Sequence, residues 1–265
     1  MLEQILAASL IKTLKLPAQD TPLLFSEDSI HNKESRLKLT EFLFEKYKVP
    51  SIFFCKDAVL SSFACGRSTA IVLDSGAETT TATPVYDGYA LQKCILRQNI
   101  GGNTLTRKLG AWLKDDMQKE IQPRFAQKVK HQNLDGQDSY SRVPVDCSLV
   151  DPAHYKWNQM QVLKDLKEEY LFCSEEPVQG NNESQAVRST MMELPDGTQL
   201  QIGNQRVSIV ESMFQQNEEL EGFSGVHSMV VESIGKTDVD IKRDLYGNII
   251  VTGGNTCFRG FVERL

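Results

Sequence analysis

Apolar residues in the N-terminal quarter of the chain follow helical and strand patterns in turn. Leucine and isoleucine recur at helical spacing over residues 2–15, which predicts an amphipathic helix. Short apolar runs at 22–26 and 51–55 predict strands, and residues 57–63 predict a helix that ends at Gly66. Because helices alternate with the strands, this order predicts a parallel strand pair joined by a crossover helix.

The crossover helix has a predicted start and a predicted core face. Ser29 or Asn32 can cap its first turn, since short polar side chains accept hydrogen bonds from the free N–H groups there. Leu37, Phe44 and Tyr47 are the residues that we expect on its buried face.

The next part of the chain predicts antiparallel strands. Residues 70–74, 79–86 and 89–96 predict three strands, which are separated by Ser75-Gly76 and by a tight turn at Asp87-Gly88. A helix is expected to follow Gly101-Gly102-Asn103 and run through Leu113, and a polar surface excursion with short helices is expected over 114–160. Next come a charged helix over 161–175, a hairpin over 193–202 around Asp196-Gly197, and a short strand with an acidic loop over 205–221. The last expected elements are a helix over 228–234, a strand over 245–252 and the start of a helix over 256–265.

Composition and charge narrow the class of protein. Hydrophobic residues make up 40% of the chain and charged residues 24%, which is ordinary for a soluble globular protein. The net charge of −6 disfavours direct contact with DNA, so the basic stretch from Arg124 to His131 is interpreted as a solvated helix face. No apolar run approaches the roughly 20 residues that span a bilayer, and the N-terminus predicts no signal peptide. Six scattered cysteines and four isolated histidines favour a reducing compartment and offer no zinc site.

Two glycine turns at distant places in the chain carry the clearest chemistry. Each follows a short apolar run: Ile71-Val72-Leu73-Asp74-Ser75-Gly76 in one case and Ile249-Ile250-Val251-Thr252-Gly253-Gly254 in the other. Glycine at the end of a strand lets backbone N–H groups face an anion. The Asp74 carboxylate could hold a hydrated magnesium ion beside a phosphate. Together the turns predict a nucleotide cleft formed by distant parts of the chain.

These segments resemble the actin family. The resemblance rests on Gly66 to Gly76, Pro84 to Leu91, Leu194-Pro195-Asp196-Gly197 with Ile202-Gly203-Asn204, Asp238 to Ile241 with Asp244-Leu245-Tyr246, and Gly253-Gly254-Asn255-Thr256. It covers nearly the whole chain except residues 114–160 and 211–225. It implies an α/β fold of the actin, chaperone and sugar-kinase type, in which mixed sheets are flanked by helices. It also implies a partial chain that lacks the family's first phosphate turn and its C-terminal end.

The resemblance implies subdomains and a branch of the family. Residues 1–64 correspond to the remainder of the first subdomain, 65–100 with 222–265 to the third, and 101–221 to the fourth, outer subdomain. Within the family, Phe53 to Leu60 and Gly66 to Ala77 look most like the nuclear actin-related subunit of chromatin-remodelling and histone-acetyltransferase complexes.

The resemblance also implies a binding site for ATP with magnesium. Asp74 would orient metal-bound water and so contact the metal through water. The residues that would contact the nucleotide are Asp74, Ser75, Gly76, Gly102, Lys164, Lys167, Glu168, Gly253, Gly254, Asn255 and Phe258. Simpler interpretations stay open: Lys164 and Glu168 as a surface ion pair, Gly253-Gly254 as a strand-to-helix corner, Phe258 as core, and Asp74 as a turn cap.

Three residues argue against efficient hydrolysis. Asp57 stands where conventional actin places a glutamine that orients the attacking water, Ala77 replaces an acidic residue, and Thr81 replaces a histidine. A carboxylate near polyphosphate adds repulsion. We therefore assign no catalytic residue, and expect nucleotide binding with very slow or no turnover.

The leading functional hypothesis is a nuclear adaptor, with a cytoplasmic pool left open. It would dock on a helical segment of the remodelling ATPase beside actin and other subunits of the complex, with no membrane partner. A filament-forming cytoskeletal ATPase is the alternative, and a sugar kinase or chaperone is a third. The acidic loop Glu218-Glu219-Leu220-Glu221 and the divergent 114–160 region favour the adaptor. An inert fragment with an unpaired sheet edge is the remaining possibility.

Overall fold

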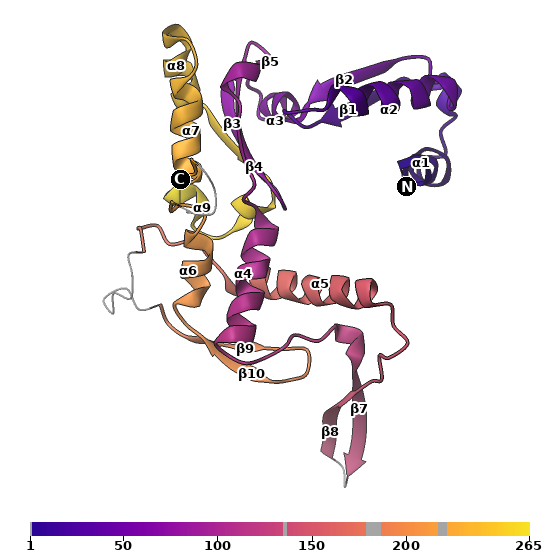
Figure 1. Cartoon of the computed structure of the whole chain (residues 1–265), viewed down its shortest axis with the longest axis vertical. Coiled ribbons are helices and arrows are strands. Elements are labelled where there is room, and N and C mark those ends of the chain that lie inside the picture. The colour runs from indigo at the N-terminus through magenta and orange to yellow at the C-terminus, as the bar shows by residue number, and fades with distance from the viewer. Residues whose placement is uncertain (1, 135–136, 179–186, 217–221) are drawn as a thin grey trace. The chain divides into compact units, whose positions relative to one another are not determined.

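The computed structural model describes residues 2–134, 137–178, 187–216 and 222–265 (Figure 1). The chain divides into two compact units. Unit 1 comprises Met1–Asp74, Thr81–Leu96 and Val230–Ile250, and unit 2 comprises Ser75–Thr80, Arg97–Met229 and Val251–Leu265. Each unit is therefore assembled from segments that lie far apart in the sequence. The subdomain boundaries expected from the resemblance stay a prediction.

The N-terminal part of unit 1 has the expected alternation of helices and strands. Its elements are α1 (Leu2–Ala7), a π-helical turn (Ala8–Thr13), a 3-10 turn (Ala18–Asp20), β1 (Leu23–Glu27), α2 (Lys33–Glu45), β2 (Ile52–Lys56) and α3 (Asp57–Ala64). Strands β1 and β2 pair in parallel, from Leu23 opposite Ile52 to Glu27 opposite Lys56, and α2 forms the crossover between them. The predicted parallel pair is confirmed.

Helix α2 corrects two details of the sequence interpretation. Asn32 is the cap, because its side chain accepts a hydrogen bond from the Glu34 amide at 2.9 Å. The predicted core face is wrong at two of its three residues: Leu37 is 64% exposed and Phe44 is 43% exposed, whereas Tyr47 packs against the buried cluster. The buried residue is Leu43, which clusters with Leu6. Residues of α1, β1 and β2 together cover the face of α2 that carries Leu43, and α2 has too little amphipathic contrast for its sequence to show that face.

The largest sheet has the strand order β11-β3-β4-β5, and β6 pairs with β4. Its strands are β3 (Ala70–Ser75), β4 (Thr80–Tyr86), β5 (Tyr89–Ala90), β6 (Leu96–Gln98) and β11 (Ile249–Thr252). Asp87 and Gly88 have φ values of 48° and 78°, so the predicted tight turn joins antiparallel β4 and β5. The expected strand 89–96 is interrupted by a 3-10 turn at Gln92–Cys94.

Two helices and the last strand complete this region. Helix α7 spans Val226–Gly235 and α8 spans Val239–Tyr246. The prediction of one strand over 245–252 is therefore wrong for its first residues: α8 continues through Tyr246, and β11 begins at Ile249. The part of α7 from Val230 onward belongs to unit 1, where the Ser233 hydroxyl donates a 2.8 Å hydrogen bond to the carbonyl of Cys94.

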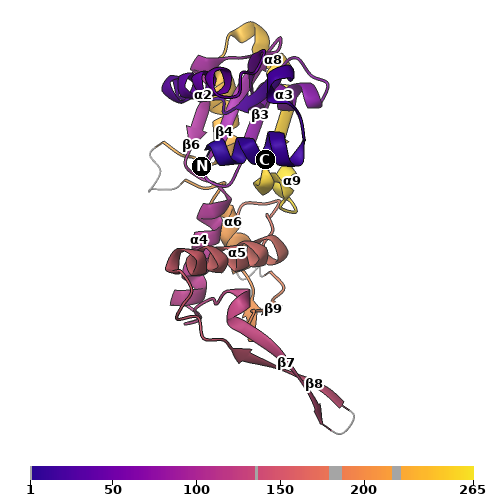
Figure 2. The same cartoon turned by 90° about the vertical axis from the view of Figure 1, so that its right-hand side faces the viewer.

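Unit 2 is largely helical, with two hairpins (Figure 2). Its elements are α4 (Gly102–Asp115), a 3-10 turn (Arg124–Ala126), β7 (Gln127–Leu134), β8 (Gln137–Pro144), α5 (Pro152–Tyr170), β9 (Thr190–Glu193), β10 (Gln199–Ile202), α6 (Gln205–Glu211), a 3-10 turn (Gly254–Cys257) and α9 (Phe261–Arg264). Helix α4 and the β9–β10 hairpin confirm two predictions.

Other predictions for unit 2 are wrong. Residues 114–160 contain a short 3-10 helix, Arg124–Ala126, and the start of α5, but their main element is the antiparallel hairpin of β7 and β8, which includes most of the stretch interpreted as a helix face. The helix expected at 161–175 begins at Pro152, where the Asp151 side chain accepts hydrogen bonds from two amides of the first turn. Residues 205–211 are helical rather than extended, and α9 begins only at Phe261. The acidic loop Glu218–Glu221 lies outside the described residues.

Within the described ranges, no helix is both long and apolar enough to cross a membrane.

Candidate functional site

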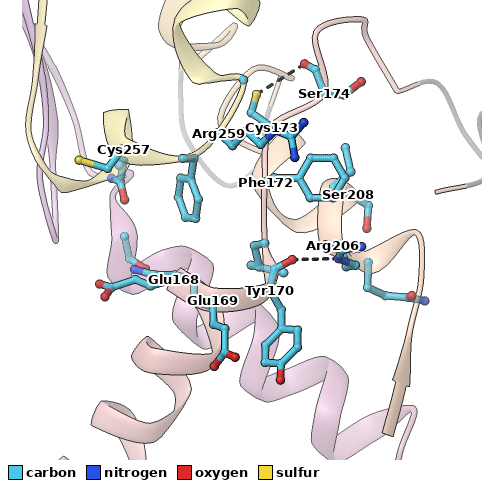
Figure 3. A pocket seen from close by; sticks show the side chains of 18 of the residues that line it. Glu168, Glu169, Tyr170, Phe172, Cys173, Ser174, Arg206, Ser208, Cys257 and Arg259 are labelled. Carbon is cyan, nitrogen blue, oxygen red and sulfur yellow. Dashed lines mark hydrogen bonds between the residues drawn. The ribbon is translucent and has the colours of Figure 1, made fainter. Parts of the chain in front are cut away.

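Unit 2 contains a cavity of about 1660 Å³ (Figure 3). Four parts of the chain line it: the turn after β3, the start of α4, the C-terminal half of α5 with the segment after it, and the 3-10 turn that leads to α9. Helix α6 contributes its first turn. The two glycine turns that the sequence singled out therefore lie on one cavity.

Asn255 joins these turns directly. Its side-chain nitrogen donates to the hydroxyl of Ser75 at 3.0 Å and to the carbonyl of Gly76 at 2.8 Å. Asn255 is 3% exposed and Ser75 is fully buried. The Ser75 hydroxyl also lies 2.9 Å from that of Thr80, which in turn donates to the carbonyl of Ile100. A buried polar chain thus connects β3, β4 and the segment before α4.

The glycines at the start of α4 permit a close approach of backbone segments. The Gly102 amide donates to the Gly76 carbonyl at 3.0 Å, and the Asn103 amide donates to the Ala77 carbonyl at 2.7 Å. A Cβ atom on Gly102 would lie 2.8 Å from Oδ1 of Asn255 and 3.0 Å from Nζ of Lys167. Only a glycine leaves both side chains in place.

Lys167 is a buried cation in the wall of the cavity. It is 5% exposed, and its ammonium group donates to the Gly102 carbonyl at 3.3 Å. The same group lies 6.0 Å from the centroid of the Phe258 ring. Burial lowers the pKa of Lys167, Glu168 counteracts this and Lys164 adds to it. Over the described part of the chain, Lys167 makes no ion pair.

Lys164 and Glu168 are more exposed members of the same wall. Their charged atoms lie 3.9 Å apart, and their side chains are 52% and 58% exposed. A contact of this length in solvent contributes little to stability. As an ion pair it is weak, so both side chains are free to turn toward a ligand.

The structure brings most of the predicted site residues together. Those that line the cavity are Gly76, Gly102, Lys164, Lys167, Glu168, Gly254, Asn255 and Phe258. Ser75 lies beneath this wall through its bond to Asn255, and Gly253 precedes the lining residues with a φ of 92°. Asp57 and Asp74 belong to unit 1.

Asp74 is the last residue of unit 1 before the first turn, and its pKa is raised. Burial is the largest cause, followed by the negative charges of Asp57 and Asp28. A nearby cation would relieve this repulsion. In the part of the chain that the structure describes, no three His, Cys, Asp or Glu side chains are grouped as ligands of a metal ion. A metal held through water, as the resemblance implies for Asp74, requires no such group.

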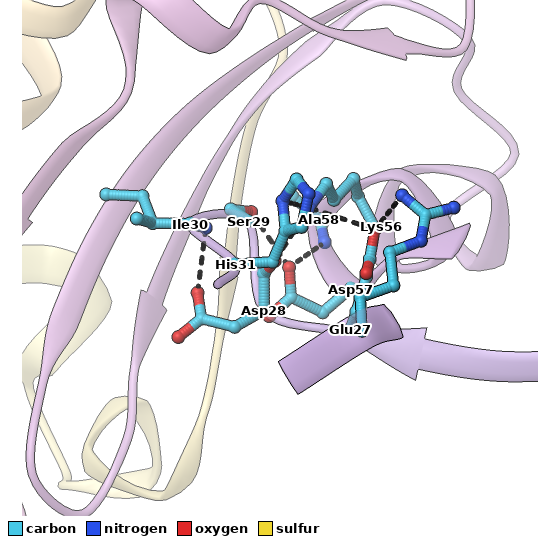
Figure 4. Close-up of polar contacts among 9 residues, drawn as sticks. Glu27, Asp28, Ser29, Ile30, His31, Lys56, Asp57 and Ala58 are labelled. Carbon is cyan, nitrogen blue, oxygen red and sulfur yellow. Dashed lines mark hydrogen bonds and ion pairs between the residues drawn. The ribbon is translucent and has the colours of Figure 1, made fainter. Parts of the chain in front are cut away.

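Asp57 is occupied by hydrogen bonds to the protein (Figure 4). Its Oδ1 accepts one from the buried Ser29 hydroxyl at 2.8 Å and one from the Ala58 amide at 2.7 Å. These bonds join the loop after β1 to the start of α3. Asp57 thus has a structural role at the carboxyl end of the parallel strand pair.

Sequence reasoning missed several residues of the cavity. The Arg206 guanidinium lies 4.9 Å from the Phe172 ring and donates to the Tyr170 carbonyl at 3.0 Å. Arg259 and Cys257 line the cavity beside the second glycine turn. Cys257 and Arg259 adjoin a predicted turn, so proximity in sequence could have indicated them. Nothing local marked Arg206 or Phe172.

Comparisons with known proteins identify the family. A profile of the family described as Actin matches residues 1–265. The chain belongs to the actin family. It is 34% identical to Actin-related protein 4 of Arabidopsis thaliana over 264 aligned residues, which cover 95% of this chain and 59% of that relative. It is 33% identical to Actin-related protein 4 from the indica and japonica subspecies of Oryza sativa, with 58% of each covered. This actin-family chain thus spans less than two thirds of the length of these curated relatives.

Membership of the actin family agrees with the expected fold class, an α/β chain in which sheets are flanked by helices. Proteins of this family bind ATP with magnesium in general. The residues here fit such an anionic ligand, because the cavity combines two glycine turns that approach closely with a buried lysine that has no ion pair among the described residues.

Proposed function

We propose that this chain is the nucleotide-holding part of a nuclear actin-related adaptor in a chromatin-remodelling complex. Bound ATP with magnesium would serve it as a structural ligand. The similarity to Actin-related protein 4 and the branch-specific segments Phe53 to Leu60 and Gly66 to Ala77 support this proposal. Its partners would be a helical segment of the remodelling ATPase, actin and other subunits of the complex.

One observation carries the nucleotide part of the proposal. Two turns that are 180 residues apart lie on a single cavity, where Asn255 bonds to the first turn and a buried lysine makes no ion pair with any residue that the structure describes. Lys167, Lys164, Glu168 and Phe258 would hold the adenosine, and the turn at Gly253-Gly254-Asn255 would lie under its base and sugar. The turn at Ser75-Gly76 would face the phosphates, and Asp74 would contact magnesium through water. A ligand that binds only the folded form would stabilise it.

The state of Asp57 supports binding without efficient hydrolysis. Its Oδ1 accepts two hydrogen bonds from the protein, from the Ser29 hydroxyl and the Ala58 amide. A carboxyl group has no N–H, so Asp57 cannot donate a hydrogen bond from nitrogen as the side-chain amide of a glutamine does. The glutamine that orients the attacking water in related enzymes therefore has no equivalent at this position. In the proposed role, bound ATP would contact the cavity through its charged phosphates and its adenine ring. The role would not require its cleavage.

The nucleotide part is tested by equilibrium binding of Mg·ATP together with phosphate release. We expect saturable binding, with loss of most affinity in Lys167→Met and a smaller effect in Lys164→Met, because only Lys167 is buried. Phosphate release should stay at the background rate. Absence of binding, or equal effects of the two variants, would contradict the proposed site, and actin-like turnover would contradict the structural role.

The adaptor part is tested with a helical segment of a remodelling ATPase as bait. We expect the chain to co-elute with this segment in gel filtration, and to remain unpolymerised in magnesium and ATP at concentrations where actin forms filaments. Filaments without helix binding would favour the cytoskeletal alternative.

A further inference from the structure

We infer that Asn255 is a positioning residue, whose side chain joins the two turns of the cavity before any nucleotide is present. The inference rests on the proposed function for its meaning, but it concerns contacts within the protein. It gives Asn255 a role that differs from direct contact with the ligand.

The orientation of the Asn255 amide is fixed by its partners. A backbone carbonyl can only accept a hydrogen bond, so the side-chain atom that lies 2.8 Å from the Gly76 carbonyl must be the nitrogen. The same nitrogen lies 3.0 Å from the Ser75 hydroxyl, and both of its hydrogens are therefore used. The side-chain oxygen then lies over Gly102, where a Cβ atom would be 2.8 Å away.

The surroundings make this joint costly to break. Asn255 is 3% exposed, so water cannot readily replace its partners. Two further backbone bonds depend on the same approach, from the amides of Gly102 and Asn103 to the carbonyls of Gly76 and Ala77. The donor capacity of Asn255 is spent on the protein, and a nucleotide would enter a cavity whose walls are already joined.

Hydrogen exchange without nucleotide tests the inference. In Asn255→Ala we expect the amides of Gly102 and Asn103 to exchange on the order of tenfold faster or more, since two buried hydrogen bonds are lost. The Val226 amide, bonded to the Met213 carbonyl elsewhere in unit 2, should keep its rate and so report on global opening. Gln159→Ala is the matched control, because the Gln159 side-chain nitrogen also donates to a backbone carbonyl of unit 2, that of Ile121, at 2.8 Å, and Gln159 is not one of the cavity-lining residues.

Unchanged exchange at Gly102 in Asn255→Ala, or equal acceleration at Val226, would overturn the inference. If Asn255→Ala does not fold, Ser75→Ala removes one of the two contacts and should give a smaller acceleration at the same amides. An Asn255→Asp variant places an oxygen opposite the Gly76 carbonyl, so its Gly102 and Asn103 amides should exchange as fast as those of Asn255→Ala.

Nucleotide binding supplies the separate readout. Asn255→Ala should raise the Kd for Mg·ATP about tenfold, and saturating Mg·ATP should restore slow exchange of the Gly102 and Asn103 amides. Gln159→Ala should leave the Kd within about twofold. If neither wild type nor variant binds Mg·ATP, the proposed function fails, while the exchange rates without nucleotide still decide the role of Asn255. Faster exchange with an unchanged Kd would contradict the positioning role toward the ligand.

Discussion

The ammonium group of Lys56 lies 2.7 Å from Nδ1 of His31 (Figure 4). Because an ammonium group has no lone pair, His31 must accept at Nδ1 and carry its proton on Nε2. The same lysine bonds to the Asp28 carbonyl at 3.0 Å and pairs with Glu27 at 3.1 Å. Lys56 therefore holds the loop after β1 in place, beside the contact between Ser29 and Asp57.

A positive charge at position 31 should destabilise unit 1, because it would lie next to the Lys56 ammonium group. In His31→Lys two ammonium groups would meet where the contact is now a hydrogen bond, and the free energy of unfolding should fall by roughly 1–2 kcal/mol. His31→Gln keeps an acceptor and should cost less than half as much. Chemical denaturation measures both variants, and equal losses would show that size rather than charge matters here.

Gly101 should tolerate no side chain. Its backbone is extended, with φ of −160°, but a Cβ atom would lie 2.5 Å from the Ala77 carbonyl oxygen, which cannot swing away. We expect Gly101→Ala to lower the free energy of unfolding by about 2–3 kcal/mol. Gly254→Ala is the control in the other turn, because a Cβ atom there meets nothing within 4 Å. A loss in Gly254→Ala as large as that in Gly101→Ala would contradict this explanation.

The ion pair between Arg264 and Glu211 should be strongly coupled. Their atoms lie 2.8 Å apart, with side chains 13% and 2% exposed. Arg264→Met leaves the Glu211 charge buried without a partner, so the free energy of unfolding should fall by about 3–5 kcal/mol. The double variant Arg264→Met with Glu211→Gln should recover part of this loss. Additive effects in the double-mutant cycle would show that the pair does not interact.

Asp74 should reduce stability at neutral pH. Burial and the charges of Asp57 and Asp28 raise its folded pKa above the ordinary value of 3.8, so the folded state binds its proton more tightly than the unfolded state. Stability therefore falls as the pH rises from 3.8 through the raised folded pKa, and Asp74→Asn should be more stable than wild type above that range.

The advantage of Asp74→Asn should disappear as the pH falls below 3.8, where both states of wild type are protonated at this position. Urea unfolding at a series of pH values measures it. Asp20→Asn, at an exposed carboxylate of unit 1, should show no such trend. An advantage that grows in acid would reverse the assigned sign.

The sequence by itself determined the features that depend on neighbouring residues. Asp87 and Gly88 can both adopt positive φ, so their turn between β4 and β5 was predictable from two letters. The order of strand, helix and strand over residues 22–55 required a parallel pair with a crossover. The two glycine turns marked the candidate site for the same local reason.

Tertiary structure decided what depends on distant partners. Leu37 and Leu43 lie on the same helix, and the packing of α1 and the β1–β2 pair against it determined that Leu43 is buried. Residues 205–211 form a helix although their pattern fits a strand. The bonds of Asn255 to Ser75 and Gly76 span about 180 residues, and no local pattern specifies a contact between segments that become neighbours only when unit 2 folds.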